Sequence, residues 1–319
     1  MRRKKGRSID GVLLLNKPLD MTSNQALQRA KRLFFAEKAG HTGSLDPMAT
    51  GVLPLCFGEA TKFSQFLLDA DKAYRTTVCL GLTTDTCDAE GDIIESQSAE
   101  AITLEQIEAA LVPFRGPIQQ VPPMYSALKR DGQPLYKLAR QGVEVKREAR
   151  NVEIKELNLL AFRPGEKAEI DLFVRCSKGT YIRSLAHDIG QLLGCGGHVS
   201  KLHRSAAGAF DESECISLDD LQVMFDQGGY ELLDQQLKSA DSPVASLPAL
   251  DLLPESAHYF RLGNPVMDGR VYRIADQGDI VRVFCAETDQ VQRRFLGLGE
   301  ITDDGRVAPK RIIANPVVS

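Results

Sequence analysis

The chain has no apolar run long enough to cross a membrane. Its 319 residues are 43% hydrophobic and 26% charged, which is typical of a globular protein with room for two domains. The first apolar segment, residues 12–15, follows a basic start and is too short for the core of a signal peptide. These absences argue against the secreted and membrane-spanning classes, and we expect a cytoplasmic protein that is not bound to a membrane.

Cysteine pairs with the spacing of a zinc or redox site are also missing. The seven cysteines are odd in number, scattered along the chain, and never spaced as C-x-x-C. We therefore expect reduced thiols, as in cytoplasmic proteins, and no bound metal.

The common catalytic motifs are absent as well. The sequence contains no phosphate-binding G-x-x-x-x-G-K-[ST] loop, no dinucleotide-binding G-x-G-x-x-G, no zinc-binding H-E-x-x-H and no G-x-S-x-G elbow. We expect no cofactor, and any chemistry must come from a less common arrangement of side chains.

Acidic residues predominate in one segment only. The formal net charge is −4, but residues 211–255 contain eleven acids and a single base, while the rest of the chain has 38 basic and 32 acidic residues. Two basic groups stand out: Arg2, Arg3, Lys4, Lys5 and Arg7, and then Lys129, Arg130, Lys137, Arg140, Lys146, Arg147 and Arg150. Such runs are often only solvated faces, so by themselves they leave nucleic-acid binding open.

The segment GHTGSLDPMATG, residues 40–51, concentrates turn-forming residues around one carboxylate. Its three glycines permit backbone angles that other residues resist, and Pro47 moves Asp46 toward extended geometry. We expect a loop, neither helix nor strand, that presents Asp46 to a ligand. An ordinary turn without a function remains the alternative for the segment, and a simple backbone hydrogen bond remains the alternative for His41.

The hydrophobic pattern predicts alternating elements over the first two thirds of the chain. Strands are expected over residues 11–15, 73–82 and 169–177. Helices are expected from Thr22 or Ser23, from Thr103 with Gln106 as its capping-box partner, from Pro134 to Gly142, over residues 181–194, and from Ser217. Residues 83–91 are expected to form a polar loop, and residues 117–123 to interrupt regular structure. The helix over residues 181–194 is expected to direct Ile182, Leu185, Ala186, Ile189, Leu192 and Leu193 inward.

The pattern changes near the C-terminal end. A Ser-Pro-Ala-rich stretch, residues 239–248, is typical of a linker. Short apolar runs at residues 271–274, 280–284, 295–298 and 311–313 are separated by glycine and aspartate turns. This pattern predicts the strands of a small β-domain.

Two side chains have the chemistry to assist a lone aspartate. Arg183 keeps its charge in a dry pocket and binds carboxylates through a planar fork, so it could orient Asp46 and lower its pKa. Tyr74 could stack a planar substrate. A surface salt bridge for Arg183 and a core or rim position for Tyr74 are the alternatives. A hydrolase that uses His41, Ser44 and Asp46 is disfavoured, because residues this close along one loop rarely point at one another correctly.

Several long motifs resemble one enzyme family. They are GHTGSLDPMATGVLPLCFGEATK from Gly40, KAYR from Lys72, LGLTTDTCDAEG from Leu80, MYSALK from Met124 and CSKGTYIRSLAHDIG from Cys176. In this order they resemble the bacterial tRNA pseudouridine-55 synthases, the TruB-like family. The resemblance implies an α+β fold for residues 1–246, with a mixed, mainly antiparallel sheet and flanking helices. FLGLGEITDDGRVAPKRII, from Phe295, is similar to the family's small PUA-type RNA-binding domain, which would occupy residues 247–319.

The resemblance also implies roles for individual residues. Asp46 matches the catalytic aspartate, Tyr74 the active-site tyrosine, and Arg183 the arginine that binds the carboxylate. His41 matches the histidine that fills the space left by a flipped nucleotide, Tyr181 a second tyrosine, and Leu202 an apolar wall. Lys129 and Arg130 would contact substrate. Ser44 and Gly197 depart slightly from the family pattern.

The implied reaction converts the T-loop uridine at position 55 of tRNA into pseudouridine. The implied partner is the T-arm stem-loop of tRNA, and a monomer without metal is expected. A non-catalytic RNA chaperone, which would need the basic surface but not the Asp46 loop, remains the alternative.

Overall fold

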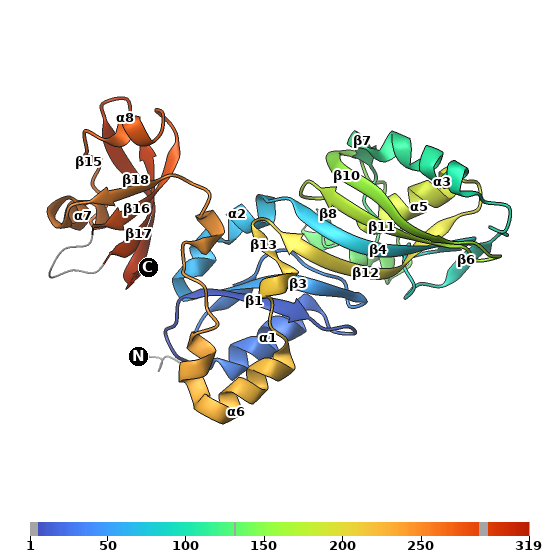
Figure 1. Ribbon diagram of the computed structural model, residues 1–319, viewed down its shortest axis with the longest axis horizontal. Helices are drawn as coiled ribbons and strands as arrows, with labels where there is room; N and C mark the ends of the chain where they lie inside the picture. Colours follow the sequence, from blue (N-terminus) through green and yellow to red (C-terminus); the bar gives the residue numbers. More distant parts are fainter. Residues whose placement is uncertain (1–5, 131, 287–292, 319) are drawn as a thin grey trace.

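The computed structural model describes residues 6–130, 132–286 and 293–318 (Figure 1). The large sheet has nine strands in the order β1-β3-β12-β4-β11-β10-β7, with β2 paired to β3 and β13 paired to β12. Its strands are β1 (Gly11–Lys17), β2 (Ala39–His41), β3 (Ala49–Phe57), β4 (Lys72–Leu80), β7 (Gly116–Gln120), β10 (Arg150–Arg163), β11 (Glu169–Cys176), β12 (Gly197–Ala207) and β13 (Phe210–Asp211). All neighbours are antiparallel except β3 and β12. The predicted α+β class is confirmed.

Helices cover this sheet near both ends (Figure 1). The helices α1 (Ser23–Leu33) and α6 (Leu218–Asp234) lie near β1 and β3, and α3 (Leu104–Leu111) and α5 (Ile182–Leu192) lie near β10 and β12. The predicted capping box of Thr103 and Gln106 is present, and the same device at Thr22 and Gln25 begins α1. Among the described residues, no helix is both long and apolar enough to span a bilayer.

A continuous core joins the sheet to these helices. Alternate residues of β11 are buried, as the pattern predicts: Ile170, Leu172, Val174 and Cys176. Leu192 was expected to point inward, but it is 56% exposed at the last residue of α5.

The edge of the large sheet corrects one prediction. Residues 117–123 were expected to interrupt regular structure, yet β7 runs from Gly116 to Gln120 and pairs with β10. β7 is the edge strand of the sheet, and Pro117 lies opposite Glu153 of β10. An edge strand has a neighbour on one side only, so the missing N–H of proline costs no hydrogen bond to a second strand. Proline is therefore compatible with this strand.

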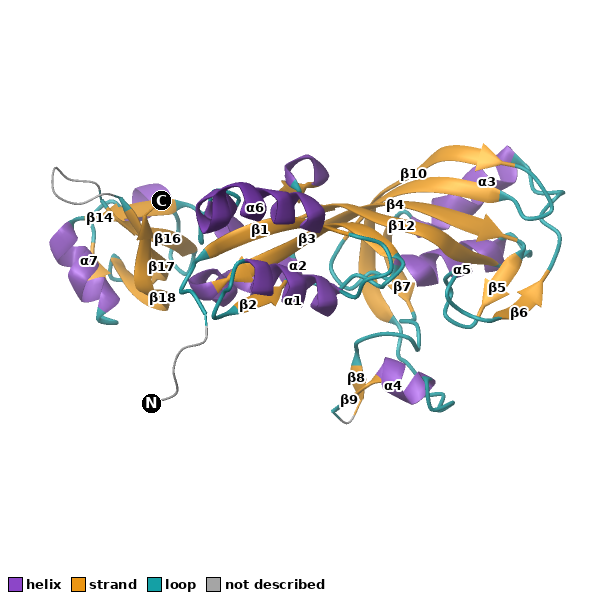
Figure 2. Ribbon diagram, turned by 90° about the horizontal axis from the view of Figure 1, so that it is seen from below, coloured by secondary structure: helices purple, strands orange, loops and turns teal. Residues whose placement is uncertain are grey.

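Two short hairpins leave the large sheet (Figure 2). One joins β5 (Leu82–Thr84) to β6 (Ile93–Ser96), so the polar loop predicted over residues 83–91 begins two residues later than expected. The other joins β8 (Lys129–Arg130) to β9 (Gln133–Pro134) and continues into α4 (Leu135–Ala139). The helix predicted from Pro134 to Gly142 is therefore shorter than expected, and Pro134 is its N-cap.

A second sheet of five strands lies toward the C-terminal end. Its order is β14-β16-β17-β18-β15, and its strands are β14 (Ala249–Leu252), β15 (Val266–Met267), β16 (Ile280–Cys285), β17 (Arg294–Ile301) and β18 (Arg306–Val318). Helix α7 (Pro254–Arg261) packs against it. Residues 271–274 were predicted as a strand and form helix α8 (Val271–Ile274) instead. Only Val271 of residues 271–274 is fully buried. The apolar residues of this run therefore belong to a single helical turn that contacts the core through one side chain.

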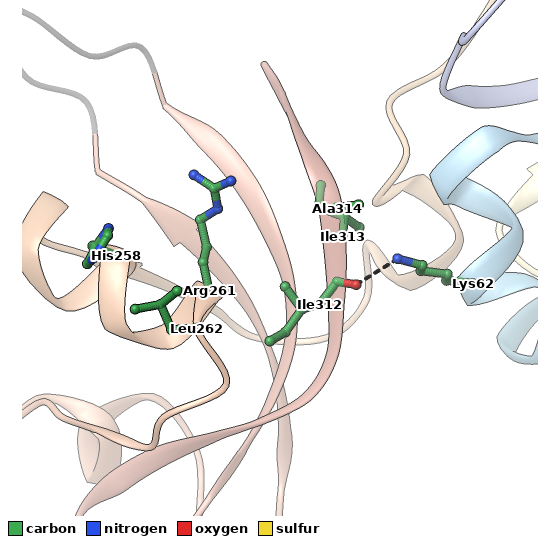
Figure 3. A pocket seen from close by; sticks show the side chains of 7 residues that line it. All are labelled: Lys62, His258, Arg261, Leu262, Ile312, Ile313 and Ala314. Atoms are coloured by element: carbon green, nitrogen blue, oxygen red, sulfur yellow. Dashed lines mark hydrogen bonds between the residues drawn. The ribbon is translucent and has the colours of Figure 1, made fainter. Parts of the chain in front are cut away.

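The two sheets meet through a short apolar junction. The 3-10 helix η1 (Gly58–Phe63) leads into α2 (Ser64–Asp69), and η1 contacts β18. Phe63 packs in one cluster with Phe284 and Phe295 of the small sheet. Beside this cluster lies a groove of about 310 Å³ lined by Lys62, His258, Arg261, Leu262, Ile312, Ile313 and Ala314 (Figure 3). Lys62 crosses to the small sheet, where its Nζ donates to the Ile312 carbonyl at 2.9 Å.

Candidate active site

The Asp46 loop connects β2 to β3 and is anchored on both sides. The first residues of the predicted loop, Gly40 and His41, belong to β2, and its last three, residues 49–51, belong to β3. Only residues 42–48 are irregular, because Gly40 and His41 pair with β3 and residues 49–51 pair with β12. Ser23 Oγ accepts from the Leu45 amide at 2.7 Å and donates to its carbonyl at 3.1 Å. The first turn of α1 therefore fixes the residue beside Asp46.

A buried lysine holds the other side of the loop. Lys17, at the end of β1, is 0% exposed, and its ammonium donates to the carbonyls of Pro18, Met21 and Pro47. Burial lowers the pKa of Lys17 to about 8, and the nearby Asp46 carboxylate opposes that change. Lys17 thus ties the loop to β1 and adds positive charge near the carboxylate.

Asp46 forms the predicted ion pair with Arg183. The Nε of Arg183 lies 3.0 Å from Asp46 Oδ2, and the side chain of Arg183 is 6% exposed while that of Asp46 is 38% exposed. The first turn of α5 supplies this guanidinium, so the pair joins two segments far apart in sequence. The carboxylate is held from behind and remains open on one side.

Several influences on the pKa of Asp46 oppose one another. Burial raises the pKa of the Asp46 carboxyl above its ordinary 3.8. Arg183 lowers that pKa, as predicted, but the effect of burial is larger, and the charge of Asp88 raises the pKa further. Arg183 thus acts on the pKa of Asp46 in the predicted direction, and burial makes the net change upward.

Arg183 also binds a second carboxylate that the sequence did not reveal. Its Nη1 lies 3.1 Å from Asp88 Oδ2, and the side chain of Asp88 is 4% exposed. Nη1 and Nη2 donate to the carbonyls of Thr86 and Tyr125 at 3.2 and 2.7 Å. These three contacts restrain the guanidinium in the position where its Nε faces Asp46. The aspartate-rich loop after Thr84 was the available signal for Asp88, but nothing in the sequence distinguishes it from Asp85 or Asp92.

Tyr74 and Leu202 lie on neighbouring strands beside the loop. Tyr74, on β4, is half-buried and packs against the main core, and Leu202, on β12, is 8% exposed opposite Ala49. Burial raises the pKa of the Tyr74 phenol, and the charge of Arg204 opposes that change. Arg204 lies directly opposite Tyr74 in the β4–β12 ladder.

Tyr181 precedes Arg183 at the beginning of α5. Its backbone amide donates to Gln120 Oε1 at 2.7 Å, and its carbonyl accepts from Gln120 Nε2 at 3.0 Å. This double hydrogen bond fixes the start of α5 against β7, and hence the position of the Arg183 guanidinium.

The remaining predicted site residues are arranged differently. His41 is half-buried on β2, and within the described residues its buried Nδ1 has no hydrogen-bond partner. Burial lowers the pKa of His41, and the charge of Arg204 lowers it further. Lys129 and Arg130 are exposed on β8, in the hairpin that projects from the large sheet (Figure 2), and they are not part of the Asp46 cluster.

The hydrolase alternative and a metal site find no support in this geometry. Ser44 is exposed, and within the described part of the chain it forms no hydrogen bond with His41 or Asp46. In the same residues, no group of three or more His, Cys, Asp and Glu side chains is placed to hold a metal ion. The chemistry available here is that of one open carboxylate, a fixed guanidinium and a neighbouring phenol.

Comparison with known sequences gives one consistent family. The TruB family pseudouridylate synthase N-terminal domain matches residues 31–182, the tRNA pseudouridylate synthase B C-terminal domain matches residues 183–245, and the pseudouridine synthase II TruB C-terminal domain matches residues 248–313. The chain is 55% identical over 313 residues to tRNA pseudouridine synthase B of Saccharophagus degradans, with 98% of each chain covered. It is 54% identical over 307 residues to the protein of that name from Pseudomonas aeruginosa, with 96% of this chain and 97% of the relative covered.

Solved structures share the fold. The structure described as a Cbf5-Nop10-Gar1 complex matches with a TM-score of 0.69 and 26% identity, covering 95% of this chain and 84% of that chain. An H/ACA RNP bound to a substrate RNA containing 2′-deoxyuridine matches with a TM-score of 0.69 and 23% identity, covering 99% and 92%. The sequence relatives and family models confirm the predicted family, and the chain belongs to the TruB family of pseudouridylate synthases.

Proposed function

We propose that the chain isomerises the T-loop uridine at position 55 of tRNA to pseudouridine, with Asp46 as the catalytic carboxylate. The observation that carries this proposal is the Asp46–Arg183 ion pair, buried on the arginine side and open on the carboxylate side. Relatives that cover nearly the whole chain are named tRNA pseudouridine synthase B. Their printed name supplies tRNA as the substrate class.

The reaction breaks the bond between N1 of uracil and the ribose, turns the base, and rejoins it through C5. Asp46 either attacks the anomeric carbon or removes a ribose proton, and the uracil leaves as an anion in both cases. Glycosidases need a second carboxyl group to protonate a poor leaving group or to activate water. Here the anion is recaptured without water, so one carboxylate is sufficient, and exclusion of water prevents an abasic product.

Arg183 supports this role through its other contacts. Because Asp88 and two backbone carbonyls hold the guanidinium, its Nε stays directed at Asp46. The ion pair favours the charged form of a carboxyl whose burial disfavours it. A half-exposed, ionised carboxylate is the form that either mechanism requires.

Tyr74 is proposed to stack the everted base and to take part in proton removal from C5. Extracting a base from a T-loop costs a few kcal/mol. Stacking on an aromatic ring returns about 1–3 kcal/mol per base. Tyr181 and Leu202 would form the second aromatic contact and an apolar wall, and His41 would fill the place of the flipped nucleotide.

Residues outside the cluster would hold the rest of the RNA. We propose that residues 1–246 form the catalytic domain and that residues 247–319 form a PUA-type RNA-binding domain. Lys129 and Arg130, exposed at the tip of a hairpin, would contact T-arm phosphates. The enzyme would act as a cytoplasmic monomer.

The decisive experiment uses an unmodified T-loop transcript without added metal or nucleotide. We expect the wild-type chain to form pseudouridine, and Asp46→Asn to bind the transcript with similar affinity but to form none. Glu90→Gln, an exposed acid close enough to feel the charge of Asp46, is the matched control and should stay active. Substantial turnover by Asp46→Asn would overturn the assigned role, and binding without turnover by the wild type would favour the non-catalytic RNA chaperone.

A further inference from the structure

A buried arginine lies next to the site without a carboxylate partner. Arg204 is 1% exposed, and within the described residues it takes part in no ion pair with aspartate or glutamate. Its Nε donates to the Val52 carbonyl at 2.7 Å, while its buried Nη2 has no partner. A buried guanidinium usually faces a carboxylate, because an uncompensated buried charge is costly. The retained charge therefore indicates a use other than a structural ion pair.

The strand register places Arg204 between the strand that carries Tyr74 and the strand that follows the Asp46 loop. On one side it lies opposite Tyr74 of β4, and on the other side opposite Gly51 of β3. Gly51 has a φ of 101°, and a Cβ atom there would lie 2.2 Å from the Arg204 carbonyl oxygen. A Cβ on Gly43, within the Asp46 loop, would lie 3.5 Å from Arg204 Nη1. The guanidinium thus sits directly beneath the loop, where the backbones come closest.

Arg204 and Tyr74 are directly paired across β12 and β4, so their side chains leave the same face of the sheet next to each other. Three groups influence the Tyr74 phenol electrostatically: Arg204 from β12, Cys176 from β11, and Asp46 from the loop. Arg204 lowers the pKa of Tyr74, whereas Cys176, Asp46 and above all burial raise it. Arg204 is therefore the one group among these that favours a phenolate at this position.

Proton removal from C5 needs such a phenolate. After the uracil has rejoined the ribose through C5, that carbon still carries its hydrogen, and C6 is doubly bonded to N1. A phenolate oxygen takes the C5 proton, the C–H electron pair forms the C5–C6 double bond, and the C6–N1 pair moves to N1. N1 then takes this proton from the phenol, directly or relayed through one water molecule, so the phenolate is restored and charge is balanced.

We infer that Arg204 is a positioning residue that holds the Tyr74 phenol and stabilises its phenolate during removal of the C5 proton. The inference rests on the proposed isomerisation and adds a second cation with a separate task. Arg183 serves the carboxylate that breaks the glycosidic bond, and Arg204 serves the phenol that completes the product.

The first test measures the ionisation of Tyr74 directly and needs no turnover. In chain labelled with ¹³C at the tyrosine ζ carbon, the Tyr74 resonance is identified by its loss in Tyr74→Phe. We expect Arg204→Gln to raise the pKa of Tyr74 by about 1–3 pH units, the usual effect of losing an adjacent opposite charge. The control is Lys72→Met, which removes a different buried cation, on β4, whose ammonium donates only to backbone carbonyls. This change should leave the pKa of Tyr74 nearly unchanged. An unchanged pKa in Arg204→Gln overturns the inference.

The second test follows the reaction under single-turnover conditions with T-loop RNA that carries deuterium at C5 of the target uridine. Arg204→Gln should slow turnover by about 10- to 100-fold, the lower part of the range for general-base catalysis, and should increase the C5 isotope effect. In the Tyr74→Phe background the same change should cost less than about threefold, because the phenol is already absent. Losses that multiply in the double variant would show a merely structural role.

A third variant keeps the inference testable if Arg204→Gln does not fold. Arg204→Lys retains the charge, but one amine cannot reproduce a planar fork that binds the Val52 carbonyl beside the paired Tyr74. We expect a smaller rise in the Tyr74 pKa and a smaller loss of rate, and no change in either would count against the inference. Failure of the wild-type chain to form pseudouridine would instead refute the proposed function, so the two failures are distinguishable.

Discussion

The Arg183 guanidinium serves two carboxylates that differ in exposure. Asp46 is open and Asp88 is closed, and both lie within about one hydrogen-bond length of the same cation. Because a single positive charge faces two negative ones, Asp88 acts on Asp46 through Arg183 and through direct repulsion. The closed member of this triad therefore affects how easily the open member ionises.

Asp88→Asn should lower stability and shift the acid limit of activity. We expect a loss of about 3 kcal/mol in unfolding free energy, because Arg183 keeps its buried charge but loses one counter-charge. The charge of Asp88 raises the pKa of Asp46, so its removal should move the acid limb of the turnover–pH profile to lower pH. Turnover should fall as the guanidinium becomes less fixed. Urea unfolding and a pH–rate profile measure these effects. Asp85→Asn, an exposed neighbour in the same loop, is the control, and an acid limb that moves to higher pH would contradict the electrostatic account.

The protonation of Asp46 has its own effect on stability. A carboxyl whose folded-state pKa is raised binds more protons in the native than in the unfolded state between the two pKa values, so its contribution to stability falls as pH rises through that window. At neutral pH we therefore expect the unfolding temperature of Asp46→Asn to equal or exceed that of the wild type. The difference between the two unfolding temperatures should shrink as pH falls toward 3.8. Thermal unfolding followed by circular dichroism checks this. A marked destabilisation at neutral pH would mean that the ion pair outweighs the cost of burial.

At the scale of elements, the Asp46 loop is positioned by the first turn of a helix. Ser23 is 3% exposed and satisfies both backbone groups of Leu45 with one hydroxyl. Lys17 reaches the carbonyl of Pro47 from β1. Two neighbouring elements thus hold the residues on either side of Asp46, which leaves little freedom for the carboxylate between them.

Ser23→Ala should separate loop positioning from helix stability. The change leaves the amide and carbonyl of Leu45 unpaired, which should cost about 1–3 kcal/mol in unfolding free energy and lower the turnover rate. Thr22→Ala removes the helix cap next to it and should cost about 1 kcal/mol with little effect on turnover. Single-turnover rates and urea unfolding of both variants measure the difference. Equal losses of turnover in the two variants would argue against a specific anchor.

At the scale of the whole molecule, one aromatic side chain connects the two sheets. Phe63 of η1 is 0% exposed and its ring centroid lies 5.3 Å from that of Phe295 on β17. Lys62, Glu59 and Arg311 add polar contacts around it. The orientation of the small sheet therefore depends on a compact contact with a strong apolar centre.

Phe63→Ala should loosen this connection. We expect a loss of about 3–5 kcal/mol, typical of removing a buried phenylalanine, and two thermal transitions in place of one as the sheets begin to unfold separately. Phe66→Ala, at an exposed position of α2, is the matched control and should change little. Differential scanning calorimetry distinguishes the outcomes, and a single unshifted transition would show that the junction does not couple the sheets.

Much of this arrangement could be predicted from local patterns. Three features depend only on residues that are close together in the sequence. They are the alternation of buried and exposed side chains in β11, the helix starts at Thr22 and Thr103, and the turn-forming residues around Asp46. Failures occurred where a short pattern fits two structures. Residues 271–274 are apolar enough for a strand, and Pro117 is excluded from inner strands but allowed at an edge. The sequence does not say which strand lies at the edge.

The sequence alone determined the secondary structure that carries Asp46, Tyr74 and Arg183, and the motifs that mark the family. Only the tertiary structure decided which charges meet. Lysine and arginine are usually found at protein surfaces, yet Lys17 and Arg204 are 0% and 1% exposed. Asp88 differs from the other aspartates of its loop through its contact with Arg183. The reason is physical: helical and strand propensities act over a few residues, whereas burial and charge pairing depend on segments that approach one another only after the chain has folded.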